Sequence, residues 1–418
     1  MLYRLIHPFA AVATRQFFRT IHLTGAELAE EGPLLIVANH PSVMLDGLLV
    51  CTSYHRPIWM LAKSTIFLGG PVNWFLKNIH MLPVYRRQDD PNQMSRNQDS
   101  FRAVCDRLHR NSAVLIFPEG QSMALRKLLP VKTGAARICF QAEQEKEFNL
   151  GLRIQAFGIT YADFTRRQSS VTIAAGKPIS IAAYRERYEQ DPEAAVRELS
   201  SDIERQLKKL TANLEDTTYQ ALVDKIGKLY RSTGLKTDDR VQLKVIAKNV
   251  EKLLPQYAEK AADIEKRLDL YLYLSSALNI DGSTALDSRA GFQFLMAPFT
   301  ILGLLIHYIP YQATVQLARL GAKHRSQIAS YGLTVGFFVF PIWWALIGSL
   351  AYHLTGRGLA AAIVVLFMML CGYLANRYIH RLMLHIFSAF WPGKRSPVDV
   401  LRWLRDDLLN ELNSLRVD

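Results

Sequence analysis

The chain has 418 residues, of which 50% are hydrophobic, a length too great for one small domain and sufficient for several segments. Its formal net charge is +13 at pH 7, but the basic residues are spread and no DNA- or RNA-binding motif accompanies them. Attraction to anionic lipid headgroups and to a phosphorylated substrate explains the excess of positive charge at least as well as nucleic acid does. The cysteines lack paired spacing, so we predict neither a disulfide framework nor a zinc site: Cys51, Cys105, Cys139 and Cys371.

An N-terminal helix is predicted over residues 1–20, where large apolar side chains are interleaved with Arg4, Arg15 and Arg19. This pattern is typical of an amphipathic helix that lies in the membrane interface. A helix packed on the following domain would show a similar pattern, so both interpretations stay open. We expect no cleavable signal peptide.

Residues 20 to 185 alternate short apolar strands with amphipathic helices, which is typical of a layered α/β fold. One such helix is predicted from Gln98 to Arg110, because its apolar residues recur at helical spacing. Those residues are Phe101, Val104, Cys105 and Leu108.

An early strand of this region, Leu34–Ala38, leads into a histidine and an aspartate that are close in sequence. The residue before a proline is restricted to extended backbone, so His40 should end the strand and project from the carboxyl edge of the sheet, where ligands bind in open α/β sheets. Ser42 can cap a helix whose first turns carry Asp46. Such a pair can form a general base, but it is common by chance and by itself does not exclude an ordinary loop histidine.

Three further segments place polar groups after apolar runs. Segment 82–87 ends in paired guanidinium groups. Segment 114–120 is a strand broken by proline and followed by a carboxylate and a glycine, which is free to take positive φ. Segment 128–137 leads into a helix start with small residues. The polar residues and the glycine of these segments are Arg86, Arg87, Glu119, Gly120 and Lys132.

The order and spacing of these blocks resemble the glycerolipid acyltransferase superfamily, which includes glycerol-3-phosphate and 1-acylglycerol-3-phosphate (lysophosphatidate) acyltransferases. Its members carry a His-Asp motif, a block ending in Arg, a Phe-Pro-Glu-Gly block and a later hydrophobic block, which corresponds here to residues 154–161 with 176–179 following. The resemblance covers about residues 20 to 185. It implies an α/β, layered acyltransferase domain with a mixed sheet flanked by helices, over residues 21–189.

The chain departs from the commonest pattern of this family in three places. Five residues instead of four separate His40 from Asp46, which resembles the fungal glycerol-3-phosphate and dihydroxyacetone-phosphate acyltransferases and marks a subfamily. His80 stands where a glycine is usual, and Phe157 where a proline is usual. These last two leave the chemistry intact and bear on details of substrate fit.

The resemblance implies transfer of an acyl group from a thioester to an alcohol. His40 would be the general base, because a neutral imidazole can take the hydroxyl proton near neutral pH. Asp46 would hold the tautomer of that ring and stabilise the imidazolium. The alcohol attacks directly, so no serine or cysteine nucleophile is needed and a Gly-x-Ser-x-Gly elbow is not expected.

The remaining residues of the motifs would bind substrate. Arg86 is the best candidate for the phosphate of the acceptor, since guanidinium forms bidentate bonds to phosphate oxygens. Arg87 either assists or faces solvent, and Lys132 is either a second phosphate ligand or a surface lysine. Glu119 holds an acceptor hydroxyl, anchors a basic side chain of the site or caps a helix. Gly120 lets the backbone approach the ligand. We expect no cofactor or metal.

From about residue 190 to 280 charges become dense and prolines and glycines rare. Long helical patterns run through 194–214, 219–231 and 238–270. We predict a helical spacer over 190–288 without chemistry of its own, and a dimerisation role for this segment stays open.

Apolar residues concentrate in the C-terminal part. Segments 327–356 and 358–376 contain no Lys, Arg, Asp or Glu and are each long enough to cross a bilayer, which takes about 20 apolar residues. We therefore predict a transmembrane hairpin over 327–376 and a cytoplasmic amphipathic tail over 377–418. The segment before the hairpin, 289–322, is also apolar and contains two prolines.

Charge predicts the orientation of the hairpin. The flanking cations are Arg319, Lys323 and Arg325 before it and Arg377, Arg381, Lys394 and Arg395 after it, against Arg357 at its tip. By the positive-inside rule both bases of the hairpin face the cytoplasm. The catalytic domain is expected on the same side, so 289–322 should be a re-entrant or interfacial segment, which Pro298 and Pro310 could break. A third full span is the alternative.

The predicted function is that of a membrane-bound O-acyltransferase in phospholipid biosynthesis. It would move a fatty acyl chain from acyl-CoA or acyl carrier protein (acyl-ACP), as co-substrate, to glycerol-3-phosphate or 1-acylglycerol-3-phosphate. A catalytically silent lipid-binding or scaffold protein on the same fold is the alternative. The expected partners are these substrates and membrane lipids, without nucleic acid, and a homo-oligomer stays open.

Overall fold

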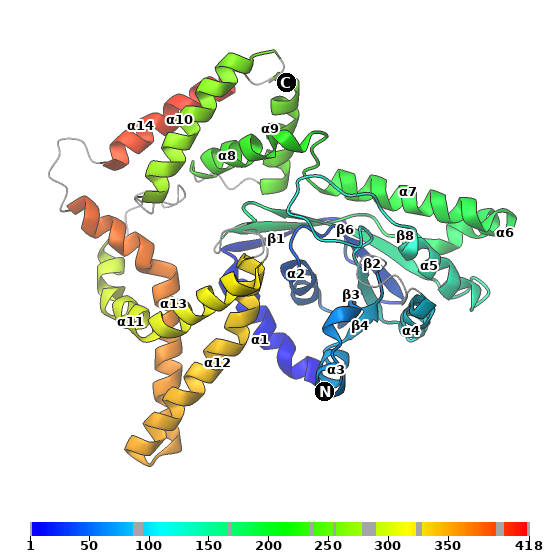
Figure 1. Cartoon of the computed structure of the whole chain (residues 1–418), viewed down its shortest axis with the longest axis horizontal. Coiled ribbons are helices and arrows are strands. Elements are labelled where there is room, and N and C mark those ends of the chain that lie inside the picture. Colours follow the sequence, from blue (N-terminus) through cyan, green and yellow to red (C-terminus); the bar gives the residue numbers. More distant parts are fainter. Residues whose placement is uncertain are drawn as a thin grey trace. The chain divides into compact units, whose positions relative to one another are not determined.

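The computed structural model describes residues 2–86, 95–164, 169–233, 238–253, 256–277, 290–322, 328–389 and 397–415 (Figure 1). The chain divides into two compact units. One comprises residues 1–217 with 238–244, and the other residues 218–237 with 245–418.

The first unit is built on one eight-stranded sheet. Its strand order is β1-β7-β6-β2-β5-β3-β4, and β8 pairs with β6. The strands are β1 (Thr20–Gly25), β2 (Leu34–Ala38), β3 (Ile58–Lys63), β4 (Met81–Val84), β5 (Ala113–Ile116), β6 (Arg153–Tyr161), β7 (Ser170–Ala175) and β8 (Ile179–Ser180). β6 runs antiparallel to β7 and β8, and the other pairings are parallel, so the sheet is mixed. The predicted layered α/β fold is confirmed.

The helices of this unit cover both faces of the sheet. They are α1 (Leu2–Phe17), α2 (Leu45–Ser53), α3 (Gly70–Asn78), α4 (Asn97–Leu108), α5 (Gly134–Gln144), α6 (Arg185–Gln190) and α7 (Pro192–Leu210). Every residue of β2 is buried, as expected for a central strand of a parallel region that is covered on both faces. Leu35 and Val37 of β2 join a core with α4, α5 and α7. Figure 1 shows α2 on the opposite face.

The helix predicted from Gln98 to Arg110 is present as α4. Its residues Val104, Cys105 and Leu108 are fully buried in the core, and Phe101 packs against that core. The periodicity therefore identified both the helix and its inner face.

Helix α7 belongs to the sheet, whereas the sequence pattern predicts a spacer that begins at residue 190. Asp191 caps the helix by accepting a hydrogen bond from the backbone of Ala194. Leu199, Ile203 and Leu207 are buried in the core of the first unit. The high charge density of this segment reflects only the solvent face of an amphipathic helix. The predicted boundary at residue 189 thus falls inside the unit.

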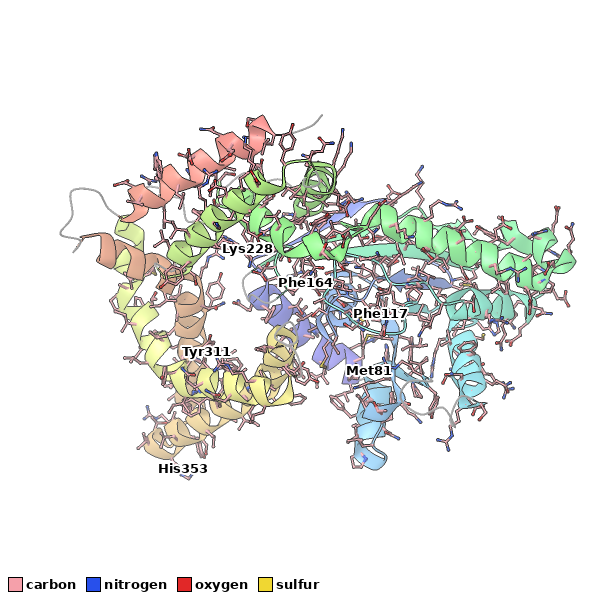
Figure 2. All side chains as sticks on the ribbon, turned by 45° about the horizontal axis from the view of Figure 1, so that its top comes forward. Met81, Phe117, Phe164, Lys228, Tyr311 and His353 are labelled. Atoms are coloured by element: carbon pink, nitrogen blue, oxygen red, sulfur yellow. The ribbon has the colours of Figure 1, made fainter. Side chains whose placement is uncertain are left out.

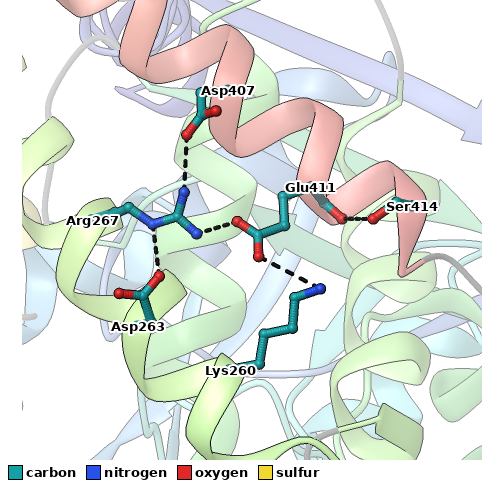
Figure 3. Close-up of polar contacts among 6 residues, drawn as sticks. All are labelled: Lys260, Asp263, Arg267, Asp407, Glu411 and Ser414. Carbon is teal, nitrogen blue, oxygen red and sulfur yellow. Dashed lines mark hydrogen bonds and ion pairs between the residues drawn. The ribbon is translucent and has the colours of Figure 1, made fainter.

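The second unit contains a group of charged helices. They are α8 (Gln220–Arg231), α10 (Ala258–Ala277) and α14 (Pro397–Ser414), and α9 (Asp239–Leu253) begins in the first unit and continues into the second. Figure 3 shows how α14 is held on α10: Arg267 forms ion pairs with Asp407 at 2.9 Å and with Glu411, and Lys260 lies 3.7 Å from Glu411. The predicted tail helix is therefore bound to the segment before the apolar helices of the C-terminal part.

Three helices are long and apolar enough to cross a membrane. They are α11 (Ala290–Gly321), α12 (Ile328–Thr355) and α13 (Gly358–Ala389), with candidate spans over Leu295–Gly321, Tyr331–Thr355 and Gly358–Ile379. The turn between α12 and α13 includes Gly356, which takes the positive φ of 64° that favours glycine. The two helices of the predicted hairpin are present.

Helix α11 is continuous, and the break that the sequence pattern allowed at Pro298 and Pro310 is absent. Close packing on α13 explains the difference. A Cβ atom on Gly303 would lie 2.0 Å from the carbonyl oxygen of Cys371, so only glycine permits this contact. The His307 imidazole accepts a hydrogen bond from the indole of Trp344 on α12 at 3.2 Å. Neighbouring helices thus stabilise a proline-containing helix that would be weak alone.

Candidate active site

The candidate residues gather at the carboxyl edge of the sheet. His40 follows β2 by two residues, Arg86 follows β4 by two and Glu119 follows β5 by three. Strands β2 to β5 are mutually parallel, so their carboxyl ends lie at one edge. The topology thereby brings together side chains from separate motifs.

His40 and Asp46 form the predicted pair. The Nδ1 atom of His40 lies 2.8 Å from Oδ2 of Asp46. A carboxylate only accepts hydrogen bonds, so Nδ1 is the donor and the lone pair of the neutral ring is on Nε2. Nε2 has no hydrogen-bond partner among the described residues, and the side chain of His40 is 15% exposed while that of Asp46 is fully buried. The pair has the geometry of a base and its orienting carboxylate.

Tyr161 completes this group, and the sequence pattern did not identify its role. Its hydroxyl donates a hydrogen bond to Oδ1 of Asp46 at 2.6 Å, and the ring is buried at the end of β6. Burial raises the pKa of the Asp46 carboxyl, and the hydrogen bonds that it accepts act in the opposite direction. Burial and the neighbouring carboxylate raise the pKa of Tyr161 well above its usual value, so the phenol stays a donor.

Ser42 was expected to cap the helix that carries Asp46. Instead α2 begins at Leu45, and its cap residue, Met44, makes no side-chain capping bond. The backbone N–H of Ser42 donates to Oδ2 of Asp46 at 2.7 Å. The carboxylate therefore orders the loop as well as the imidazole, which explains why the helix starts later than predicted.

Phe117, which is labelled in Figure 2, supports the other side of the imidazole. Its ring stacks on that of His40 with centroids 3.9 Å apart and an interplanar angle of 10°. The aromatic face fixes the plane of the imidazole, while Asp46 fixes its rotation within that plane. The orientation of Nε2 is thus set by two independent contacts.

Glu119 holds the site together through backbone groups. Its Oε1 accepts from the N–H of His40 at 2.7 Å, and its Oε2 accepts from the N–H of Leu129 at 2.8 Å. Burial raises the pKa of Glu119, and these two hydrogen bonds act in the opposite direction. Each oxygen can accept a second hydrogen bond, so the predicted substrate-binding role of Glu119 stays a prediction. The contacts that the structure shows position the loop of His40.

Two cations converge on Gly120, which takes a positive φ of 70°. Nη1 of Arg86 donates to the carbonyl oxygen of Gly120 at 3.2 Å. A Cβ atom on Gly120 would lie 2.6 Å from Nζ of Lys132. Lys132 is exposed, and its ammonium group lies beside this loop, so the structure is compatible with a second phosphate ligand and with a surface lysine. Arg87 lies outside the described residues.

Asn39 joins the loop of His40 to β6. Its side-chain amide donates to the carbonyl of Ile159 at 3.0 Å and accepts from the N–H of the same residue at 2.6 Å. This double contact extends the pairing of β2 with β6 beyond Ala38. Asn39 therefore fixes the backbone immediately before His40, a role that sequence spacing could not reveal.

A small pocket, part of it open to solvent, lies beside this loop. Asn39, Pro41 and Glu119 contribute to its wall, together with Phe164, which Figure 2 labels. Arg126 is a buried residue of the pocket wall, and its guanidinium donates to the carbonyl oxygens of Tyr161 and Ala162. The loop of the imidazole therefore borders a small pocket that is partly open to solvent.

His80 explains one of the departures from the family pattern. Its backbone has a positive φ of 66°, which accounts for the glycine usual at this place. The imidazole is stacked between Tyr3 and Trp59, with ring centroids 4.2 Å from each. Burial lowers the pKa of His80 to about 4, and Arg107 adds to this effect.

Among the described residues, no three His, Cys, Asp or Glu side chains could together hold a metal ion.

Comparison with known proteins identifies relatives of part of this chain. The acyltransferase family model matches residues 20–160. Glycerol-3-phosphate O-acyltransferase 2 of Saccharomyces cerevisiae is 27% identical over 164 residues, which are 39% of this chain and 21% of that protein. Glycerol-3-phosphate O-acyltransferase 1 of the same yeast is 29% identical over 133 residues, 31% of this chain and 17% of that protein. The chain thus matches only about a fifth of each yeast protein.

A solved structure is also similar. The crystal structure of the 1-acyl-sn-glycerophosphate (LPA) acyltransferase PlsC from Thermotoga maritima has a TM-score of 0.36 and 17% identity, and covers 50% of this chain and 81% of its own. The matched segment 20–160 contains the predicted base, its carboxylate and both cations at Gly120. Residues 20–160 therefore form an acyltransferase domain of the glycerolipid acyltransferase superfamily.

Proposed function

We propose that the protein is a membrane-bound O-acyltransferase that moves a fatty acyl chain from acyl-CoA or acyl-ACP to glycerol-3-phosphate or 1-acylglycerol-3-phosphate. The observation that carries this proposal is the oriented imidazole. Asp46 and Phe117 together fix the ring of His40 so that Nε2 has no protein partner among the described residues. A base with a free lone pair at the ligand-binding edge suits the deprotonation of an alcohol.

This geometry supports the following reaction. Nε2 of His40 takes the proton of the acceptor hydroxyl as its oxygen attacks the thioester carbonyl. The carbon–oxygen bond forms, the carbon–sulfur bond breaks, and the imidazolium returns the proton to the thiolate that leaves. Asp46 stabilises the imidazolium between these two steps, as the aspartate does in serine hydrolases. The substrate alcohol is itself the nucleophile.

The cations at Gly120 support a phosphorylated acceptor. Arg86 and Lys132 both reach this glycine, and guanidinium and ammonium groups are the side chains that bind phosphate most strongly. The acceptor's phosphate would then be held beside β4 and β5 while its hydroxyl reaches His40. Glu119 links the two halves, since one carboxylate binds the loops on both sides.

The membrane region is proposed to cross the bilayer twice. The ion pairs of Arg267 hold α10, before the membrane region, against α14, after it. Charged helices in contact lie on one side of a bilayer, so the chain between them crosses an even number of times. Helices α12 and α13 supply two crossings, and the even count then assigns α11, which is one continuous helix, to an interfacial position. The positive-inside rule then places α10 and α14 in the cytoplasm.

An acceptor panel tests the proposal. The full-length protein in phospholipid vesicles would be given acyl-CoA or acyl-ACP with glycerol-3-phosphate, 1-acylglycerol-3-phosphate or glycerol, and the products identified by mass spectrometry. We expect an ester with a phosphorylated acceptor and much less with glycerol. Absence of any ester would favour the silent scaffold instead, a function that the complete set of oriented site residues argues against.

A further inference from the structure

Arg86 follows the part of β4 that pairs with the sheet. β4 is the last strand in the strand order, so it has a strand neighbour on one side only, and its pairing with β3 ends at Val84. Tyr85 and Arg86 come directly after this last paired residue. The strand ladder therefore does not hold the backbone that carries the proposed phosphate ligand, and the polar groups of that backbone need other partners.

Asn97 supplies backbone contacts at this point. The N–H of Tyr85 donates to Oδ1 of Asn97 at 3.0 Å, and Nδ2 of Asn97 donates to the carbonyl oxygen of Tyr85 at 2.7 Å. One side-chain amide thus binds both polar groups of the residue before Arg86, as a residue on a neighbouring strand would. The contact extends the edge of the sheet by one residue.

Formation of the helix that contains Asn97 does not explain these two bonds. Asn97 is the first residue of α4, and the cap residue of this helix, Arg96, makes no side-chain capping bond. Asparagine at the start of a helix commonly bonds the backbone of its own first turn. Here the amide reaches Tyr85, which lies 12 positions away in the chain. The contact therefore serves the segment that ends in Arg86.

Helix α4 gives Asn97 a rigid support. Val104 and Leu108 of this helix are fully buried in the core of the first unit, and Figure 1 shows α4 beside β4. The guanidinium of Arg96 lies 5.8 Å from the centre of the Tyr85 ring, which is a cation–π contact. The start of α4 thus holds both the backbone and the ring of Tyr85.

We propose that Asn97 is a positioning residue for phosphate binding, which fixes the backbone of Tyr85 so that the guanidinium of Arg86 is directed to the phosphate of the acceptor. The guanidinium itself is held at Gly120, whose carbonyl oxygen accepts from Nη1 of Arg86. The backbone contact and this side-chain contact together define where the positive charge lies. The inference rests on the proposed function through the role of Arg86.

Kinetics of the full-length protein in phospholipid vesicles test this role. Asn97→Ala is compared with Val104→Ala, which weakens the core packing of the same helix and leaves the amide of Asn97 in place. At equal amounts of folded protein, we expect Asn97→Ala to raise KM for the phosphorylated acceptor about 10-fold, because a displaced guanidinium binds phosphate less well. KM for the acyl thioester and the pH profile should not change. An equal rise in Val104→Ala would overturn the proposal.

A double-mutant cycle asks whether Asn97 acts through Arg86. If it does, Asn97→Ala has no further effect on KM for the acceptor in a chain that already carries Arg86→Ala, so the two effects are not additive. A merely structural role of Asn97 would give the same loss in both backgrounds. Additive effects would therefore overturn the proposal.

Binding measured without the thioester separates this inference from the proposed function. Glycerol-3-phosphate would be titrated calorimetrically into the wild type, Asn97→Ala and Val104→Ala. Weaker binding by Asn97→Ala alone, with no ester formed by any of the three proteins, would contradict the proposed function and support the positioning role. Binding and ester formation that are equal in the wild type and Asn97→Ala would contradict the positioning role alone.

Discussion

Glu119 is a residue whose two oxygens both accept backbone hydrogen bonds at the site. A Glu119→Gln substitution would place an amide NH₂ against one of these N–H donors. We expect a loss of about 1–3 kcal/mol in the free energy of unfolding, as for an unsatisfied buried group, and a slower reaction because the loop of His40 shifts. Thermal unfolding and initial rates of acyl transfer measure both effects.

Glu143 offers a matched control for this substitution. It is fully buried and its carboxylate accepts from the N–H groups of Leu150 and Leu152, but it lies before β6, at the opposite edge of the sheet. Glu143→Gln should destabilise the protein similarly and leave the rate per folded molecule unchanged. An equal loss of rate in both variants would show that Glu119 has no positioning role.

His80 makes stability depend on pH. Its folded-state pKa is lowered to about 4 by burial, below the ordinary value of 6.5. The unfolded chain therefore binds a proton first as the pH falls, and the stability present above pH 6.5 is lost progressively toward pH 4. In His80→Phe this loss should be smaller, since phenylalanine stacks without titrating. Unfolding midpoints would be measured across this pH range for the wild type and His80→Phe. An equal fall of the midpoint in both proteins would contradict the assignment of this pH dependence to His80.

The motif residues at the site follow from the sequence because they stand shortly after a strand or, like Asp46, in the helix that follows it. His40, Asp46 and Arg86 could be placed by local rules for proline, helix starts and strand ends. Tyr161 and Asn39 could not, since their roles depend on the pairing of β2 with β6, more than 100 residues apart in the chain. A tyrosine at a strand end has no local signal that distinguishes a hydrogen-bond donor from a core residue.

At the scale of elements, the contact between α11 and α13 depends on glycine. A Cβ atom on Gly303 would meet the backbone of Cys371, whereas one on Gly332 of α12 would meet nothing within 4 Å. We expect Gly303→Ala to separate the two helices and cost about 1–3 kcal/mol, as overpacking does. Gly332→Ala should be harmless. Thermal unfolding midpoints in detergent would be measured for both variants. Equal midpoints would argue against this packing.

Helix and strand positions were predictable where the apolar period is clear, as in β2 and α4. The role of α7 was not, because its charged outer face resembles a solvated spacer and its inner face needs the sheet to be recognised. The sequence pattern did not predict that α11 is continuous, for a related reason. Proline rules describe an isolated helix, while Gly303 and His307 show a helix supported by its neighbours.

For the whole molecule, the proposed topology makes a prediction about accessibility. Cysteines introduced at Arg402 in α14 and Val241 in α9 should react with a membrane-impermeant maleimide from the same side of sealed vesicles. A cysteine at Arg357, in the turn of the hairpin, should react from the other side. Reaction of positions 402 and 241 from opposite sides would mean an odd number of crossings and would contradict the proposal that α11 does not cross the bilayer.

The central claim is that His40 is the general base of an acyl transfer. The direct test compares the turnover of His40→Ala with that of His109→Ala. His109 is a partly buried histidine that bonds the carbonyl oxygen of Ala142. It precedes β5 and so lies away from the carboxyl edge of the sheet. With equal amounts of folded protein in the same vesicles, we predict a loss on the order of 10²–10⁴ for His40→Ala alone. Wild-type turnover by His40→Ala would contradict the account.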